Sequence, residues 1–246
     1  MLTPLYKAIR YAADNELLTT KTASSIYNNY LEVKNRQYSD KVETQKIRYL
    51  TPEQMKSLLS LYPQLPHQRT REILDMFLFA FHCCGMRVSD IITLEWKHID
   101  WEKKELIKNY FKTKMAGNIP LTDPALEILS RWRSYNRNKR FVFDLLPENF
   151  DLKDPKSLKN ARLTKNRTIQ QSLRSIGDKL GLSFNLTMHV ARHTFAVMAI
   201  KKGVNIHLIS KLMGHSSIMV TEKVYAVFMQ SEIEKTVREC LSFNFK

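Results

Sequence analysis

Apolar residues recur at helical spacing along most of this chain, and this periodicity does the most to limit its possible folds. The clearest start is "LTPEQMKSLLSLY", where Thr51 can cap a helix, Pro52 can take its first position and Gln54 can complete a capping box. The same spacing predicts further helices over residues 4–18, 69–83, 89–96, 123–135, 166–180, 188–202, 205–213 and 218–228.

One stretch departs from the helical pattern. In "KELIKNYFKTKMAGNIPLTD", residues 104–123, two short apolar segments flank Ala116-Gly117-Asn118. Short apolar segments around a glycine-containing turn signal are typical of a β-hairpin. The sequence therefore predicts a mainly α fold with a small antiparallel β-sheet (α+β).

Composition divides the chain into three parts. The pattern of residues 1–24 predicts a helix followed by the segment in which the chain leaves it. Residues 25–48 contain many charged, Asn and Gln residues and few apolar ones, which is typical of a linker. The main domain is expected over 49–246. It ends in the amphipathic tail "SEIEKTVRECLSFNFK", which either packs on its own domain or docks elsewhere.

The charge balance points to a polyanionic partner. The chain has 39 Lys and Arg against 24 Asp and Glu, a net charge of +15, which favours nucleic acid or an anionic membrane surface over a merely Lys-rich face. No apolar run approaches the roughly 20 residues of a spanning helix. The three cysteines form no CxxC pair, so we expect a cytoplasmic location and no zinc knot.

The segment "MHVARHTFAV" places His189 and His193 one helical turn apart, with Arg192 between them. A metal site is disfavoured, because Val190 stands where a metalloprotease has Glu and Arg192 would put a positive charge beside the metal. Two alternatives stay open, a pair of core histidines or an anion site. Arginine can hold two phosphate oxygens, and a neighbouring histidine can move a proton.

Three other residues could complement such an anion site. Arg87 follows the glycine in "CCGMRVSD", His215 follows a helix-ending glycine, and Tyr225 lies ten positions after His215. Each also has a structural explanation. Arg87 can pair with Asp90, His215 can favour a helix C-terminus, and Tyr225 can be a packing aromatic.

Taken in order, however, the arginine, a hairpin lysine, His-x-x-Arg-His, Gly-His and the tyrosine resemble the tyrosine recombinase (phage integrase) family. "CCGMRVSDIITLEWKHID" and "MHVARHTFAVMAIKKGVNIHLISKLMGHSSIMVTEKVYA" resemble its two arginine boxes, and the resemblance runs from about Tyr49 to Tyr225. Its style is closest to integrases of bacterial mobile elements. It implies the tyrosine recombinase catalytic-domain fold and a reaction that cleaves and rejoins DNA through a 3′-phosphotyrosyl intermediate.

The resemblance also implies a role for each catalytic residue. Arg87 and Arg192 would hold the non-bridging oxygens of the scissile phosphate, and His215 would donate to the same group. Tyr225 would attack phosphorus, with His189 assisting proton transfer. No metal and no cofactor is implied.

The same family frame implies the remaining site residues. Lys112, nine positions before the Leu of Ile119-Pro120-Leu121, would protonate the leaving 5′ oxygen. Lys114, on the same face of an extended strand, is its rival. His193 and Asp90 would support the site from behind.

The implied partners are double-stranded DNA and, on DNA, three further copies of the chain. Without DNA a monomer is expected. The implied location is the bacterial nucleoid. Residues 1–24 resemble the end of an N-terminal DNA-clamping domain. The spacing from His215 to Tyr225 exceeds the family's usual nine, and we expect a loop near Met219–Thr221 to absorb the extra residue. A type IB topoisomerase-like enzyme and an inactive DNA-binding remnant are the alternatives.

Overall fold

The computed structural model describes residues 4–26, 28 and 47–241, and the chain divides into two units, Met1–Ile47 and Arg48–Lys246. In the first unit, α1 covers Pro4–Asp14, and residues 20–26 are helical again. The predicted helix over 4–18 is therefore too long. Most of the predicted linker lies outside the described residues.

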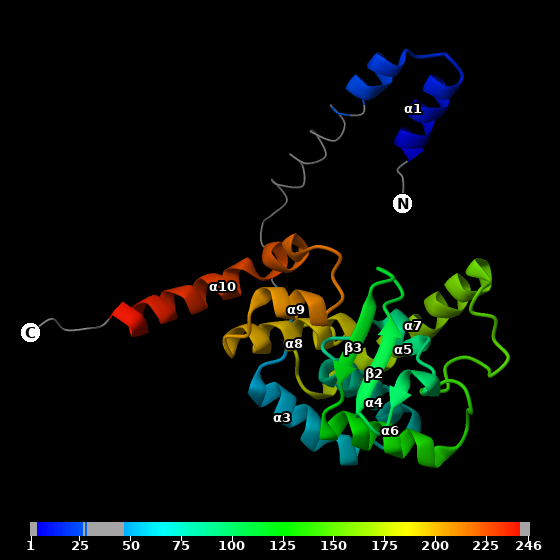
Figure 1. Ribbon diagram of the computed structural model, residues 1–246. Helices are drawn as coiled ribbons and strands as arrows, with labels where there is room; N and C mark the ends of the chain where they lie inside the picture. The colour runs from blue at the N-terminus through cyan, green and yellow to red at the C-terminus, as the bar shows by residue number, and fades with distance from the viewer. Residues whose placement is uncertain (1–3, 27, 29–46, 242–246) are drawn as a thin grey trace, which may run out of the picture. The chain divides into compact units, whose positions relative to one another are not determined.

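The second unit is mainly helical with one small sheet, which confirms the predicted fold class (Figure 1). Its elements are α3 Pro52–Leu61, α4 Gln68–His82, α5 Val88–Ile92, β1 Ile99–Asp100, β2 Glu105–Asn109, β3 Ala116–Pro120, α6 Asp123–Tyr135, α7 Pro155–Lys179, α8 Met188–Lys201, α9 Ile206–Leu212 and α10 Ile218–Leu241, with 3-10 turns at Tyr62–Gln64 and Trp96–His98.

The start of α3 has the predicted capping box. The Thr51 hydroxyl accepts the Gln54 N–H at 3.2 Å, and the Gln54 side chain accepts the Thr51 N–H at 2.9 Å. Just before it, the buried Leu50 donates its N–H to the Thr194 hydroxyl on α8 at 2.9 Å. The first residues of the unit are thereby fixed to the helix that carries Arg192.

The hairpin is present, but its predicted turn is wrong. The sheet has the antiparallel order β1-β2-β3, with Leu106 opposite Ile119. Ala116-Gly117-Asn118 belong to β3, and the chain reverses over 110–115, where Lys114 has φ +58° and donates its N–H to the Tyr110 carbonyl at 2.8 Å. The turn was missed because a lysine, and not glycine or asparagine, takes the left-handed conformation.

Helix α4 forms the centre of the core. Nine consecutive residues from Glu72 to Ala80 are buried, and α6, α7 and α8 pack against this helix. Its two buried carboxylates are paired, since Arg137 contacts Glu72 and Arg131 lies 3.6 Å from Asp75. Such pairing is what a buried charge requires. The chain leaves this fixed helix directly into the segment that carries Arg87.

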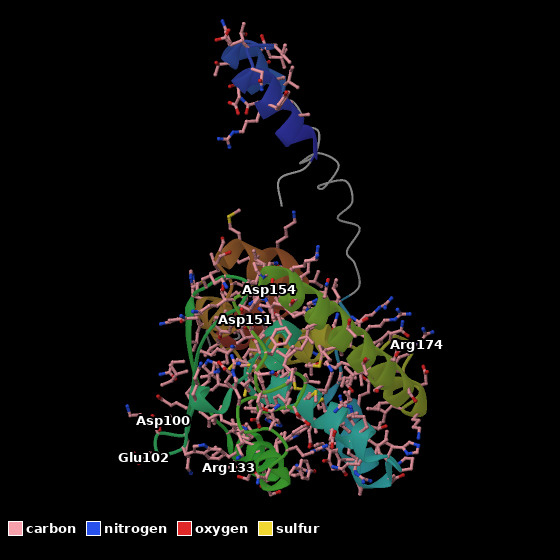
Figure 2. The ribbon with its side chains drawn as sticks, turned by 90° about the vertical axis from the view of Figure 1, so that its right-hand side faces the viewer. Asp100, Glu102, Arg133, Asp151, Asp154 and Arg174 are labelled. Carbon is pink, nitrogen blue, oxygen red and sulfur yellow. The ribbon has the colours of Figure 1, made fainter. Side chains whose placement is uncertain are left out.

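Helix α7 is longer than predicted, and Figure 2 shows Asp154 at its start and Arg174 farther along it. Asp154 caps the helix by accepting the Lys156 N–H at 3.0 Å. The first three turns are polar and largely exposed, so apolar spacing revealed only the second half. Asp100 and Glu102 are labelled at the lower left of the same view, where Asp100 accepts the Glu102 N–H at 3.1 Å and thereby stabilises the turn between β1 and β2.

Helix α10 is continuous where a helix over 218–228 and a separate tail were predicted. Met219–Thr221 are helical, so the expected loop is not there; the non-helical link between α9 and α10 covers residues 213–217. Several apolar side chains of this helix are exposed, namely Met219, Val220, Val224, Val227, Ile233 and Val237. This surface does not pack against the helix's own unit.

Candidate active site

The guanidinium groups of Arg87 and Arg192 converge on one backbone turn. Arg87 Nη1 donates to the carbonyls of Met213 at 3.3 Å and Gly214 at 3.2 Å. Arg192 Nη2 donates to the same Met213 carbonyl at 2.7 Å, and its Nη1 donates to the Gly85 carbonyl at 2.6 Å. Segments far apart in sequence therefore meet around the turn at the end of α9.

A glycine makes the approach of these two segments possible. Gly85 has φ +71°, and a Cβ there would lie 2.9 Å from the Arg192 Cα. A larger residue would push the Arg87 segment away from α8. Gly85 thus does more than end α4, because it also allows Arg87 to approach Arg192.

The two arginines hold positive charge in a partly buried place. Burial, followed by the nearby charge of Arg87, lowers the pKa of Arg192 to about 10, and burial also lowers the pKa of Arg87. All hydrogen bonds that these groups make within the described residues end on neutral acceptors. Asp90, a suggested partner of Arg87, instead accepts the Phe111 N–H at 2.6 Å. A cluster of this kind attracts an anion.

His215 completes the cluster of Arg87, Arg192 and His215, called the arginine cluster below. Its Nε2 lies 2.7 Å from Arg192 Nη2 and its Nδ1 lies 2.6 Å from the Thr221 hydroxyl. Because arginine can only donate, Nε2 accepts and the proton sits on Nδ1. Burial and then the charges of Arg192 and Arg87 lower the pKa of His215 to about 4, so the ring is neutral.

Tyr225 lies beside this cluster and is 1% exposed. Its hydroxyl is 2.8 Å from His193 Nδ1, and the two ring centroids are 5.7 Å apart. Burial raises the pKa of Tyr225 well above its usual value, and the Arg192 charge opposes that rise. A phenol in this position needs a base to lose its proton.

The structure places His193, and not His189, against the phenol. His189 is exposed on the first turn of α8, with its ring centroid 6.4 Å from that of His193. Burial, then the charges of His189 and Arg192, lower the pKa of His193 to about 4, which keeps it neutral and able to accept a proton. Partial desolvation and the charge of Arg192 lower the pKa of His189 as well.

Three lysines lie on the hairpin. Lys112 is exposed in the turn between β2 and β3. Lys114 is also in this connection, with its ammonium 4.8 Å from the Phe111 ring, so the expectation of two lysines on one face of an extended strand is wrong. Lys108, which the sequence pattern did not single out, donates from Nζ to the Thr93 carbonyl at 2.9 Å, and burial lowers its pKa.

Two residues of the site were missed in the sequence. Thr221, which orients His215, lies four positions before Tyr225 on α10, and this one-turn spacing could have revealed it. Tyr110, which donates to the Leu212 carbonyl at 2.5 Å, carried no signal, since only the fold brings the hairpin to the end of α9.

Within residues 4–26, 28 and 47–241, no three His, Cys, Asp or Glu side chains gather as metal ligands would. In the same ranges, no helix has the length and apolar character needed to cross a membrane. The described residues instead assemble a positively charged cluster suited to bind an anion. Beside it lies a tyrosine whose hydroxyl contacts a neutral histidine.

Comparison with known proteins gives relatives of one kind. A tyrosine recombinase XerA of Pyrococcus horikoshii is 27% identical over 190 residues, which cover 76% of this chain and 60% of that protein. A tyrosine recombinase XerC of Roseiflexus castenholzii is 29% identical over 187 residues, covering 75% of this chain and 56% of the relative. This chain therefore spans about 60% of the length of these curated relatives.

Solved structures agree in fold. The Tn1549 transposon integrase in complex with transposon right end DNA has a TM-score of 0.60 at 19% identity, over 93% of this chain and 84% of that one. The crystal structure of XerA recombinase has a TM-score of 0.57 at 16% identity, over 98% and 83%. The family model of the phage integrase family matches residues 48–231. These findings and the residues above show that the chain belongs to the phage integrase family.

Proposed function

We propose that this chain is the catalytic part of a site-specific DNA recombinase, which cleaves and rejoins DNA strands through a 3′-phosphotyrosyl intermediate. The observation that carries the proposal is the Tyr225 hydroxyl, 2.8 Å from His193 and beside an arginine cluster whose hydrogen bonds end on neutral groups. A phosphodiester is the anion that a tyrosine nucleophile in such a site would attack.

The arginine cluster would bind the scissile phosphate. Arg192 Nη2 now donates to His215 Nε2. A non-bridging phosphate oxygen would take over this donor, as well as that of Arg87, and would free His215 to interact with the phosphate itself. Donors already held in place stabilise the charge that develops in the transition state.

Tyr225 would be the nucleophile, and its burial sets a condition for attack. At 1% exposure the phenol does not reach a DNA phosphate, so α10 would shift to open the site when DNA binds, without breaking the hydroxyl's contact with His193. His193, whose Nδ1 lies 2.8 Å from the hydroxyl, would take the phenol proton as the oxygen–phosphorus bond forms. His189, exposed one turn earlier, would then act from the DNA side.

Lys112 would protonate the 5′ oxygen as it leaves. Its place in an exposed turn between β2 and β3 lets it approach DNA bound at the arginine cluster. The covalent phosphotyrosine keeps the energy of the broken bond, so rejoining would need neither a metal ion nor a cofactor.

The proposed partners are double-stranded DNA and, on DNA, further copies of this chain in a tetramer. The net charge of +15 supports DNA binding, and the Tn1549 relative was solved with DNA. The exposed apolar side chains Ile233 and Val237 support docking of α10 on a neighbouring copy over packing on its own unit. We expect a monomer without DNA and a location at the bacterial nucleoid.

A covalent-capture assay tests the proposed function. The chain is mixed with a nicked duplex built on the sequence that it selects from a random DNA pool, and a protein–DNA adduct is sought on a denaturing gel. We expect an adduct from the unaltered chain and from Tyr135→Phe, a control on the distant α6, and none from Tyr225→Phe. EDTA should not change the yield.

The outcomes also separate the alternatives. An unaltered chain that binds the duplex and never forms an adduct would be an inactive DNA-binding remnant. The named relatives are recombinases, which does not favour a type IB topoisomerase-like enzyme; adducts formed equally on any sequence would favour it.

A further inference from the structure

Tyr110 connects the hairpin to the turn that holds the two arginines. It follows the last residue of β2, is 4% exposed, and donates its hydroxyl to the Leu212 carbonyl at 2.5 Å. Leu212 ends α9, and the next two residues are Met213 and Gly214, whose carbonyls accept from the arginines. One side chain thus connects both parts of the site.

Two glycines make room for the Tyr110 ring. A Cβ at Gly117 would lie 2.9 Å from the ring, and a Cβ at Gly214 would overlap it. Gly117 belongs to β3 and Gly214 has φ +63° in the turn after α9. The ring therefore lies between both strands of the hairpin and the arginine-binding turn, in a space that larger residues at either glycine would fill.

Two more contacts hold the turn on each side of Lys112. The Phe111 N–H donates to Asp90 Oδ1 at 2.6 Å, and the Thr113 hydroxyl donates to the Gly214 carbonyl at 3.3 Å. Lys112 itself is exposed between these anchored neighbours. Its backbone is held on both sides, and its charge is close enough to contribute to the lowered pKa of His215 in the arginine cluster.

We propose that Tyr110 is a positioning residue that holds the Lys112 turn against the Met213–Gly214 turn, so that Lys112 reaches the leaving oxygen of the bound phosphate. The inference rests on the proposed strand-cleavage function. In the step, the Tyr225 oxygen bonds to phosphorus and its proton passes to His193. The bond from phosphorus to the 5′ oxygen breaks, and a Lys112 proton passes to that oxygen.

The test compares two nicked duplexes that differ in one atom. In one, the bridging 5′ atom of the scissile phosphate is oxygen; in the other it is sulfur, which leaves as a thiolate and needs no proton. Loss of a correctly placed acid slows cleavage of the oxygen duplex and leaves cleavage of the sulfur duplex unchanged. A general structural defect slows both.

Tyr110→Leu should slow cleavage of the oxygen duplex about 100-fold, the scale of an approximately 1 Å misplacement, and the sulfur duplex less than about threefold. Tyr110→Phe keeps the ring and loses only the hydroxyl. We therefore expect about fivefold slower cleavage of the oxygen duplex, the scale of one hydrogen bond, and no change in cleavage of the sulfur duplex. Lys112→Ala should show the same selective loss, and Tyr135→Phe none. Affinity for the uncleaved duplex should stay within about twofold.

Equal slowing of both duplexes by Tyr110→Leu, or full activity of that variant on the oxygen duplex, would overturn the inference while leaving strand cleavage intact. A Lys112→Ala variant that sulfur does not rescue would remove the acid through which Tyr110 acts, and would overturn it too. No adduct from the unaltered chain on either duplex contradicts the proposed function itself. If Tyr110→Leu does not fold, Tyr110→Phe tests the inference. Slowing confined to the oxygen duplex supports it, and equal slowing of both duplexes or full activity overturns it.

Discussion

The arginines and the groups that must act with them are held in different ways. Arg192 is 5% exposed on α8, which packs against the buried α4, and Gly85 lies directly against its backbone. Lys112 is exposed in a turn, and Tyr225 lies on α10, whose outer side chains are largely exposed. Arg192 therefore belongs to the core and Lys112 to the surface, while Tyr225 is a buried side chain on a helix whose outer face is exposed.

The groups proposed to bind the phosphate are therefore held differently from the groups proposed to react with it. Groups that stabilise charge work best when they are fixed before the substrate arrives, because they then need no reorganisation. A nucleophile fixed and exposed in the same way would attack DNA at any time. In this structure the phenol is buried, and the turn that carries Lys112 is held next to α9 by contacts such as that of Tyr110.

The largest expected effect comes from the core region. Arg192→Ala removes the donors to Gly85, Met213 and His215 together. We expect adduct formation on the nicked duplex to fall about 1000-fold, the upper scale for loss of one charge-stabilising donor. Arg131→Ala, which breaks the distant pair with Asp75, is the control and should leave the cleavage rate unchanged. Equal losses in both variants would show that Arg192 acts through stability alone.

A glycine pair tests the close approach in the core. Gly85→Ala places a Cβ 2.9 Å from the Arg192 Cα, whereas Gly181, at φ +66°, has nothing within 4 Å. Both changes strain the backbone, at about 1 kcal/mol each, but only Gly85→Ala adds overlap, for a total of about 3 kcal/mol. Urea unfolding and the adduct assay give the comparison. Gly181→Ala should cleave normally, and equal destabilisation would contradict the role assigned to Gly85.

The contact of α10 with the arginine cluster is expected to matter less. Thr221→Val removes the acceptor of the His215 N–H while keeping the side chain's shape. The cost of one hydrogen bond is about 1 kcal/mol, so we expect cleavage to slow roughly fivefold. Thr236→Val, farther along α10, removes a hydroxyl bonded only within the helix and serves as the control. A Thr221→Val variant with full activity would show that His215 is positioned from the core alone.

A further expected effect is a pH dependence of stability. The pKa values of His193 and His215 are lowered to about 4 in the folded chain, whereas in the unfolded chain they lie near 6.5. Below about pH 6.5 the unfolded state binds protons that the folded state does not, so these residues destabilise the fold as pH falls toward 4. His193→Gln should flatten the slope of the urea midpoint between about pH 7 and 5, and Thr236→Val, which removes no titratable group, should not. A steeper slope in His193→Gln would contradict this.

The sequence was informative where local chemistry determines structure. The capping box at Thr51 follows from neighbouring residues, and so do the bounds of α6. Longer-range features were not accessible. The polar first turns of α7 lack apolar spacing, Lys114 gives no sign of its positive φ, and nothing local shows that His193 faces Tyr225 or that Tyr110 reaches Leu212.

The most direct measurement is to identify the residue that carries DNA. Adduct trapped on the nicked duplex is digested with protease and nuclease, and the modified peptide is sequenced by mass spectrometry. The account predicts a nucleotide joined through its 3′ phosphate to Tyr225. A modification on another residue, or a 5′ phosphate linkage, would contradict it.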